Sequence, residues 1–391
     1  MVRVGCEVLR DTPNISLKGH GLIKLGTDKE KEEMEEALMR VKKRKDEGAS
    51  SPSTTYCVTG ATGYIGSWLV KTLLERGYTV HATVRDPEKS LHLLSLWTRG
   101  DRLRVFKADL NEEGSFDEAV RDCDGVFHVA ASMEFNVGQK ENIEAYVQTN
   151  IIDPSIKGTL NLLKSCMNSN SVKRVVFTSS ISTITAKDNN GKWKPVVDES
   201  CQIQSEHVLK TKASGWVYAL SKLLTEEAAF KFAKENDIDL VSVIATTVAG
   251  PFFTACVPSS VKVLLSPLTG EPEFFKILSA VNARMGSIAL VHIEDICSAH
   301  IFLMEHSKAE GQYICSNQSY PLSMLANLLT KEYSYSNKKR IDEKNYDKVP
   351  SDICSKKLQD LGFSYKHGLE DIIHQTIICC LDYGYLPPIR K

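Results

Sequence analysis

Three glycines between a short apolar strand and a helix place the strongest constraint on the fold of this chain. Tyr56–Thr59 has the composition of a buried strand, Gly60-Ala-Thr-Gly63-Tyr-Ile-Gly66 follows it, and Ser67–Gly77 has helical spacing. A second β-rich run, Tyr78–Val84, completes a strand–helix–strand unit. Glycines at such a turn let the backbone approach a pyrophosphate closely, and the helix N-terminus faces it with free N–H groups. This context predicts a dinucleotide-binding site.

The alternation of strands and helices continues along the chain. Further strands are predicted at 103–108, 125–131 and 173–178, and Ile143–Met167 is predicted to be mostly helical. Such alternation is typical of an α/β fold with a doubly wound parallel sheet, the Rossmann architecture. Ligands of these sheets bind at the carboxyl ends of the strands, where Ser180 stands on the fifth strand.

The sequence divides into three predicted parts. In the segment 28–47, 15 of 20 residues are charged, so we expect 1–54 to be a disordered or partly helical tail. Residues 55–249 are predicted to form the nucleotide-binding Rossmann domain. Residues 250–391 are predicted to form mainly a smaller substrate-binding lobe, with elements that pack back on the Rossmann sheet. The helices predicted in this last part cover 259–265, 294–306, 322–333 and 369–383.

Charge and composition exclude two classes of partner. The formal net charge is −1, so no broad attraction to nucleic acid or to an anionic membrane is expected. Leu240–Val261 carries no charge, yet its β-branched start and Gly250-Pro251 favour a buried strand and a loop over a membrane span. Eleven scattered cysteines without a C-x-x-C pair are typical of reduced core thiols. We therefore expect a cytoplasmic protein, with a monomer favoured.

The end of the second strand indicates which dinucleotide is bound. An acid there usually binds the ribose 2′-hydroxyl of NAD, whereas an arginine accommodates the 2′-phosphate of NADP. The strand ends Thr83-Val84-Arg85-Asp86-Pro87, with Arg85 first and Lys89 within reach of the same corner. Asp86 would be compatible with NAD, but Pro87 suggests a turn that carries its carboxylate away. The charge pattern favours NADP(H).

A tyrosine and a lysine four residues apart predict the catalytic chemistry. Tyr218 and Lys222 lie near the start of a predicted helix, Trp216 to about Glu235, and their spacing puts both on one helix face. A phenol is a poor acid–base catalyst at neutral pH, but a neighbouring ammonium favours the phenolate and lowers the pKa of the phenol. The same ammonium can hold the nicotinamide ribose, and the hydroxyl of Ser180 can hold the substrate oxygen.

These motifs together resemble those of an extended short-chain dehydrogenase/reductase. The resemblance rests on Thr59-Gly60-x-x-Gly63-x-x-Gly66, Asp109-Leu110, Ser180 and Tyr218-x-x-x-Lys222. The chain is more closely similar to the plant branch that holds dihydroflavonol, anthocyanidin and cinnamoyl-CoA reductases. That similarity is carried by the segments 83–87, 257–260, 292–300, 311–315 and 357–363. The resemblance covers about residues 55–385 and does not cover the N-terminal tail.

The resemblance implies an NADPH-dependent reductase that passes hydride to a flavonoid or related phenolic carbonyl substrate. Tyr218 would supply the proton, Lys222 would adjust the pKa of the Tyr218 phenol, and Ser180 would orient the substrate oxygen. Arg85 would contact the 2′-phosphate of the cofactor. The predicted cofactor-binding residues are Gly60, Thr62, Gly63, Tyr64, Ile65, Gly66, Arg85, Lys89, Asp109, Leu110, Val129, Ala130, Ala131, Tyr218 and Lys222.

Three departures from the family pattern concern the substrate. Thr185 stands five residues beyond Ser180, where dihydroflavonol reductases have an asparagine, and it is the predicted substrate contact. Anthocyanidin reductases are more similar to this chain at that position. Ala245 stands where the family usually has proline, after the strand that precedes the nicotinamide. Gly215-Trp-Val-Tyr218 replaces the long catalytic signature of cinnamoyl-CoA reductases, which argues against CoA esters.

One polar cluster resembles a set of metal ligands. It consists of His292, Glu294, Asp295 and His300. However, 288–292 is predicted as a strand and Glu294 as the start of a helix, on which Glu294 and His300 do not share a face. Because this spacing matches no closed ligand set, no metal site is expected.

Two other functions are compatible with the same fold. An isomerase or epimerase would hold its dinucleotide tightly and return the hydride, so it would consume no NADPH. A non-catalytic regulator would bind NADPH without turnover. The plant-type motifs and Arg85 count against the isomerase, and the intact Ser180, Tyr218 and Lys222 set favours the reductase.

Overall fold

A computed structural model of the chain describes residues 54–90, 102–131, 137–138, 141–188, 190–333 and 351–388. The predicted tail up to residue 53 lies outside these residues. The main feature is a seven-stranded sheet with the order β10-β7-β5-β4-β1-β2-β3, and all of its paired strands run parallel. Its strands are β1 (Thr55–Thr59), β2 (Thr79–Val84), β3 (Leu103–Lys107), β4 (Gly125–His128), β5 (Arg174–Ser180), β7 (Leu240–Ala245) and β10 (Gly311–Cys315). The predicted doubly wound α/β fold is confirmed.

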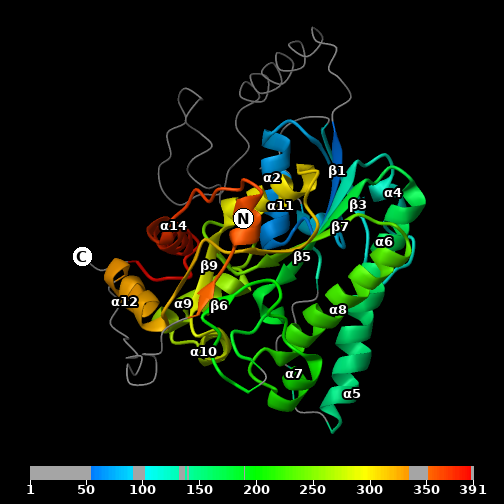
Figure 1. Cartoon of the computed structure of the whole chain (residues 1–391). Coiled ribbons are helices and arrows are strands. Elements are labelled where there is room, and N and C mark those ends of the chain that lie inside the picture. The colour runs from blue at the N-terminus through cyan, green and yellow to red at the C-terminus, as the bar shows by residue number, and fades with distance from the viewer. Residues whose placement is uncertain are drawn as a thin grey trace, which may run out of the picture. The chain divides into compact units, whose positions relative to one another are not determined.

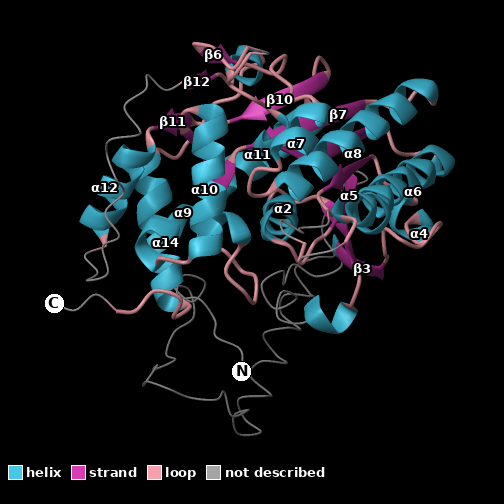
Figure 2. Ribbon diagram, turned by 90° about the horizontal axis from the view of Figure 1, so that it is seen from below, coloured by secondary structure: helices cyan, strands magenta, loops and turns pink. Residues whose placement is uncertain are grey.

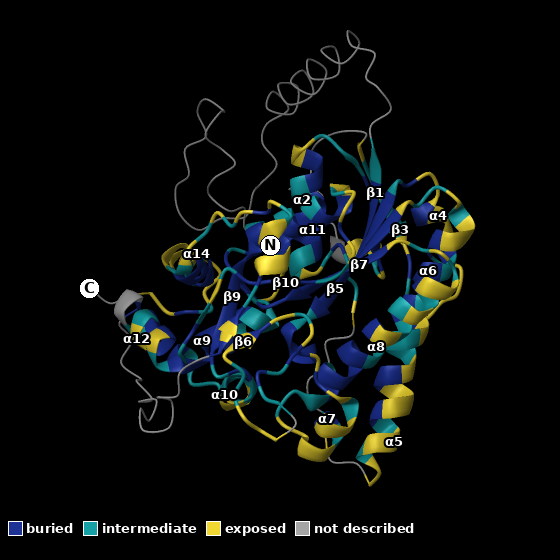
Figure 3. Cartoon of the chain, viewed as in Figure 1, coloured by how far each residue is buried: buried dark blue, intermediate teal, exposed yellow. Residues whose placement is uncertain are grey.

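Helices cover both faces of this sheet (Figure 1). On one face α2 (Tyr64–Glu75) packs against α11 (Ile293–Glu305), and on the other α6 (Asp153–Ser169) packs against α8 (Trp216–Glu235). The strands β1, β2, β4, β5 and β7 are buried almost throughout, the edge strand β3 is partly exposed, and exposed residues gather on the outer helices (Figure 3). The short α4 (Asp117–Val120) contacts α6. Strands buried on both faces explain why their sequences are almost continuously apolar.

The long helical segment between β4 and β5 is interrupted by one wide turn. It consists of α5 (Ile143–Val147), a π-helical turn over Gln148–Ile152 and α6. A π turn adds a residue to one helical turn and so changes which side chains face the sheet after it. The sequence predicted a mostly helical segment here but not this turn.

Four helices gather beside the main sheet around a second hydrophobic cluster (Figure 2). They are α9 (Ser259–Thr269), α10 (Pro272–Met285), α12 (Leu322–Glu332) and α14 (Leu369–Asp382). A three-stranded sheet of β8 (Thr247–Ala249), β9 (Ile288–His292) and β11 (Gln318–Tyr320) adjoins them. The sequence did not predict α10. The boundary at residue 249/250 stays a prediction, and β10 lies beyond it yet belongs to the main sheet.

Several short elements complete the described chain. A two-stranded sheet pairs β6 (Val196–Val197) with β12 (Asp352–Ile353). The uncharged stretch from Leu240 forms β7, β8 and a loop, as predicted, and among the described residues no helix has the length and apolarity needed to cross a membrane. The other elements are η1 (Pro87–Ser90), η4 (Ile181–Thr183), α7 (Ser205–Thr211) and α13 (Lys356–Asp360).

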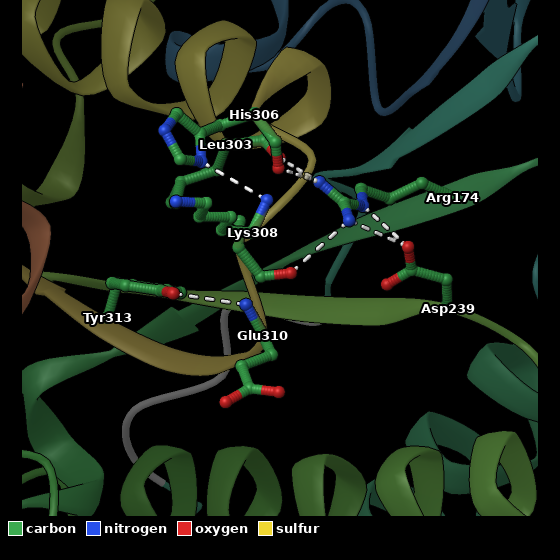
Figure 4. A network of polar contacts seen from close by, with 8 residues as sticks. Arg174, Asp239, Leu303, His306, Lys308, Glu310 and Tyr313 are labelled. Carbon is green, nitrogen blue, oxygen red and sulfur yellow. Dashed lines mark hydrogen bonds and ion pairs between the residues drawn. The ribbon is translucent and has the colours of Figure 1, made fainter. Parts of the chain in front are cut away.

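A buried arginine ties the main sheet to the end of α11 (Figure 4). Arg174, the first residue of β5, donates from Nε to Asp239 over 2.8 Å. Its Nη1 donates to the carbonyl oxygens of Leu303 and His306, and its Nη2 donates to that of Ala309. One guanidinium therefore satisfies a carboxylate and three carbonyl groups in the connection from α11 to β10.

Removing this guanidinium should destabilise the fold. Arg174→Leu leaves buried carbonyl oxygens without donors, so we expect a loss of about 3–5 kcal/mol of unfolding free energy. Asp239→Asn should cost less, because the Asp239 side chain is 45% exposed and water can replace its partner. Urea unfolding of both variants measures the difference. Equal losses in the two variants would contradict the assigned role of the carbonyl contacts.

Candidate active site

A cleft of about 1030 Å³ lies at the carboxyl ends of the central strands. Segments that follow β1, β2, β3, β4, β5 and β7 line it, together with residues of α8, α9 and α10. Because all the strands are parallel, their carboxyl ends meet along one edge of the sheet, and side chains from distant parts of the sequence converge there. The cleft holds the predicted catalytic residues Ser180, Tyr218 and Lys222.

The glycine loop forms one wall of the cleft by close backbone contact. Gly60 has a φ of +66°, and a Cβ atom there would lie 2.9 Å from the Cα of Ala130. A Cβ atom at Gly66 would overlap the carbonyl oxygen of Gly60. The N–H of Gly63 donates to the same oxygen over 2.9 Å, which closes the turn. A residue with a side chain in place of Gly60 or Gly66 would force this turn open.

Thr59 fixes the loop to the end of β4. Its hydroxyl accepts the N–H groups of Val129 and Ala130 at 3.1 Å and contacts Nδ1 of His128 at 3.0 Å. The other ring nitrogen of His128 contacts the hydroxyl of Thr159. Burial, aided by the charge of Lys222, lowers the pKa of His128 to about 3, so this histidine is neutral. It is a packed, hydrogen-bonded side chain.

The structure brings nearly all of the predicted cofactor residues together. Those that line the cleft are Gly60, Thr62, Gly63, Tyr64, Ile65, Arg85, Asp109, Leu110, Val129, Ala130, Ala131, Tyr218 and Lys222. Gly66 lies behind the loop and supports it. The side chain of Lys89 lies outside the described residues.

Tyr218, Ser180 and Lys222 are close neighbours at the ends of β5 and α8. The hydroxyls of Ser180 and Tyr218 are hydrogen-bonded, and Ser180 Oγ also accepts the N–H of Ser182. Lys222 Nζ donates to the carbonyl oxygen of Thr178 over 2.8 Å. The helix places Tyr218 and Lys222 on the same face because they are one turn apart.

The pKa of Tyr218 differs from the sequence-based expectation. Burial raises the pKa of Tyr218, and the hydrogen bond from Ser180 only partly opposes this. The ammonium of Lys222 is directed to the carbonyl oxygen of Thr178, and burial lowers the pKa of Lys222 itself to about 8. The phenol is therefore protonated at neutral pH, which is the state that a proton donor requires.

A glutamate that the sequence analysis did not single out supports this group. Glu226 is buried one further turn along α8, and its two carboxylate oxygens accept hydrogen bonds from Ser179 in β5 and Ser242 in β7. Its charge favours the ammonium form of Lys222 and so opposes the effect of burial on the pKa of that lysine. The sequence does contain a pattern that could have identified Glu226, because it follows Lys222 by four residues, as Lys222 follows Tyr218.

Two residues that departed from the family pattern have different positions. Ala245 ends β7, pairs with Ser180 and Cys315 in a regular parallel ladder, and lines the cleft. Thr185 is not among the described residues that line the cleft, and its hydroxyl accepts the N–H of Lys187. The structure therefore does not bring the predicted substrate contact to the cleft.

Only two of the four residues of the candidate metal cluster lie together in the structure, and a third residue from a distant segment joins them. His292 and Glu294 meet His367, and their possible ligand atoms lie within 4.8 Å of one another. His292 accepts the N–H of Glu294, and the carboxylate of Glu294 contacts His367 at 3.2 Å. The imidazole rings of His292 and His367 lie 3.8 Å apart between centroids. Asp295 instead accepts two backbone N–H groups, and His300 bonds to Thr178. The absence of a metal site stays a prediction, and these contacts give each side chain a structural role.

A parallel sheet with a glycine loop and a serine–tyrosine–lysine set defines a nucleotide-dependent enzyme class, and comparison with known proteins names it. The chain belongs to the NAD dependent epimerase/dehydratase family, whose model matches residues 56–315. It is 47% identical over 332 residues to a putative anthocyanidin reductase of Ginkgo biloba, across 83% of this chain and 94% of that protein. The resemblance to the plant reductases is confirmed.

Two further relatives extend this result. The chain is 42% identical over 344 residues to a bifunctional dihydroflavonol 4-reductase/flavanone 4-reductase of Malus domestica, across 86% of this chain and 93% of that protein. Among solved structures, vestitone reductase from alfalfa (Medicago sativa) superimposes with a TM-score of 0.69 at 34% identity. That match covers 85% of this chain and 99% of vestitone reductase.

The lowered pKa of Lys222 predicts a pH-dependent contribution to stability. A lysine whose folded pKa lies near 8 loses its proton on the folded protein before it does so on the unfolded chain. The cost of burying the ammonium is therefore complete below about pH 8 and disappears as the pH rises towards the unfolded value of about 10.4. The stability of Lys222→Met relative to the natural protein should fall across this interval.

Denaturant unfolding at pH 7 and pH 9.5 measures this difference. Lys231→Met, at an exposed position of the same helix, is the matched control for loss of a lysine. A difference between the natural protein and Lys222→Met that stays constant with pH would show that burial does not shift the titration of this lysine.

Proposed function

We propose that this protein is an NADPH-dependent reductase that acts on the carbonyl group of a flavonoid or a related phenolic substrate. The observation that carries the proposal is the presence of Ser180, Tyr218 and Lys222 in one cleft beside the glycine loop. The names of the relatives support the substrate class, since they are anthocyanidin, dihydroflavonol and vestitone reductases.

The residues of the glycine loop fit the pyrophosphate of a dinucleotide. The N-cap residue of α2, Gly63, makes no side-chain cap hydrogen bond, and the first turn of α2 contains no acid. The N–H groups of the first turn after Gly63 and the partial positive charge of this helix end therefore suit the binding of an anion. The close approach of Gly60 to Ala130 leaves no room for a side chain at residue 60, where the loop lines the cleft.

The end of β2 supports NADP(H) rather than NAD(H). Arg85 lines the cleft and is exposed, so its guanidinium is free to bind a 2′-phosphate in a bidentate manner. The carboxylate of Asp86 accepts the N–H of Glu88, and Asp86 is not among the described residues that line the cleft. The turn at Pro87 therefore directs the acid away from the position where it would bind a ribose 2′-hydroxyl.

The chemistry of the reduction divides between the cofactor and three side chains. Bound NADPH supplies the hydride that reaches the carbonyl carbon of the substrate. Tyr218 donates the proton that the carbonyl oxygen takes up, and its raised pKa keeps this proton available. Ser180, hydrogen-bonded to Tyr218, orients the same oxygen. The ammonium of Lys222 holds the nicotinamide ribose and adds positive charge beside the phenol.

Replacing the phenol should stop turnover without preventing cofactor binding. For Tyr218→Phe we expect kcat to fall about 100- to 10,000-fold, because general acid catalysis is lost, while the Kd for NADPH changes less than about twofold. NADPH absorbance is followed with an anthocyanidin, a dihydroflavonol, a hydroxycinnamoyl-CoA and simple aromatic ketones. Tyr383→Phe, at an exposed position outside the cleft, is the control.

The outcomes of this assay separate the proposed function from other uses of the fold. Turnover of a flavonoid with net loss of NADPH supports the reductase. Conversion of a substrate without net loss of NADPH would instead identify an isomerase or epimerase. Binding of NADPH without turnover of any compound would contradict the flavonoid reductase and favour a regulator.

Arg85 should determine the preference between the two dinucleotides. Arg85→Gln removes a charged hydrogen bond to the 2′-phosphate, so the Kd for NADPH should rise about 10- to 100-fold while the Kd for NADH stays the same. Fluorescence titration of both cofactors measures this, with Arg121→Gln at an exposed position outside the cleft as control. Tighter binding of NADH than of NADPH by the natural protein would overturn the assignment.

A further inference from the structure

Two polar side chains on the cleft wall have buried atoms without hydrogen-bond partners. In Arg284 these atoms are Nε and Nη2, and in Ser182 it is Oγ. Both residues line the same cleft as Ser180 and Tyr218. Buried polar groups are nearly always hydrogen-bonded, so two unpaired groups in one cleft call for a partner that is not part of this chain.

The position of Arg284 on its helix directs it to the cleft. Ile277, Val281 and Arg284 are spaced four and three residues apart on α10, and all three line the cleft. This spacing forms one helix face, so an apolar stripe ends in a single cation. The carbonyl oxygen of Arg284 also accepts the N–H of Ala186, which ties the end of α10 to the segment that follows η4.

Among the described residues, no acid offsets the charge of Arg284. Burial alone lowers the pKa of Arg284 to about 10, with no contribution from a neighbouring carboxylate, so the guanidinium is still cationic at neutral pH. The only carboxylate among the described residues that line the cleft belongs to Asp109, which accepts hydrogen bonds from Asn111 after β3. An unpaired buried cation costs folding free energy, and such costs are commonly retained where a ligand supplies the partner.

Ser182 lies beside the catalytic residues in the same cleft. It lies in η4, two residues after Ser180, and its main-chain N–H donates to Ser180 Oγ over 3.2 Å. The hydroxyl of Ser182 therefore stands beside the group that orients the substrate oxygen, but it makes no hydrogen bond within the protein. The substrate end of the cleft thus offers a hydroxyl next to the reacting centre and a guanidinium on the facing helix.

We propose that Arg284, with Ser182, is a substrate-anchoring site for a group that presents two neighbouring acidic oxygen atoms. This proposal rests on the reductase function proposed above and specifies the substrate of the same cleft. Nε and Nη2 form one edge of the guanidinium, and this edge matches two adjacent oxygen atoms that carry negative charge. A carboxylate has this chemistry, and so does a pair of neighbouring phenolic hydroxyls once one of the two has lost its proton.

Binding of small probes tests the site independently of turnover. Benzoate and catechol, with benzamide and anisole as neutral controls, are titrated calorimetrically into the full chain with and without NADPH. Arg284→Met should weaken binding of benzoate, of catechol or of both by at least about 10-fold, since a charged hydrogen bond is lost, and should leave the neutral probes unchanged. Loss for one acidic probe alone identifies which of the two oxygen pairs is bound.

Further variants separate anchoring from a structural role. Arg284→Lys keeps the charge but not the planar fork, so we expect an intermediate loss, and Ser182→Ala should weaken the same probes by a few-fold. The thermal midpoint of the free Arg284→Met protein should be equal to or above that of the natural protein, because an unpaired buried cation is removed. If this variant does not fold, Arg284→Lys and Ser182→Ala carry the same comparison.

Turnover then relates the anchor to the reductase. With substrates that carry the acidic oxygen pair, Arg284→Met should raise KM at least about 10-fold and leave the Kd for NADPH unchanged. Probe binding that depends on Arg284, without reduction of any substrate, would contradict the proposed reductase function and still support the anchoring site. Equal probe binding by Arg284→Met and the natural protein, or no binding of either acidic probe by the natural protein, would overturn the anchor.

Discussion

The turn between β1 and α2 packs directly against the end of β4, and Thr59 joins them through one hydroxyl that contacts His128, Val129 and Ala130. This contact leaves no room for a Cβ atom at Gly60. The distance between two neighbouring parallel strands therefore sets the shape of the nucleotide end of the cleft. Because main-chain atoms make most of the contact, the loop is held in place before any ligand binds, and little ordering is required on binding.

The opposite wall depends on how α8 is fixed to the sheet. Tyr218, Lys222 and Glu226 follow one another at four-residue spacing, and each is bonded to a group in or beside β5. A buried ammonium is costly, and here a carbonyl oxygen and the nearby carboxylate compensate for it in part. The helix cannot rotate without breaking all three interactions. Catalytic geometry and the packing of α8 on the sheet are thus the same set of contacts.

The sequence predicted those features that depend on local pattern. Buried parallel strands have continuous β-branched runs, and the helix predicted from Trp216 to about Glu235 matches the observed bounds of α8. The features that were missed depend on distant partners. His367 meets Glu294 from 73 residues away, and Arg284 is notable only because the fold leaves it unpaired. Thr185 was predicted as a substrate contact from its position five residues beyond Ser180; its hydroxyl accepts the N–H of Lys187, and it is not among the described residues that line the cleft.

Three cations from different elements line the cleft. Arg85 follows β2, Lys222 belongs to α8 and Arg284 belongs to α10, and among the described lining residues Asp109 is the only acid. A dinucleotide phosphate accounts for the first cation, and the proton transfer accounts for the second. Neither role applies to Arg284, since neither the cofactor nor the transferred proton needs a cation on α10. A substrate that brings negative charge would offset the cost of burying this cation, and the cleft would then take an acidic substrate as well as an acidic cofactor.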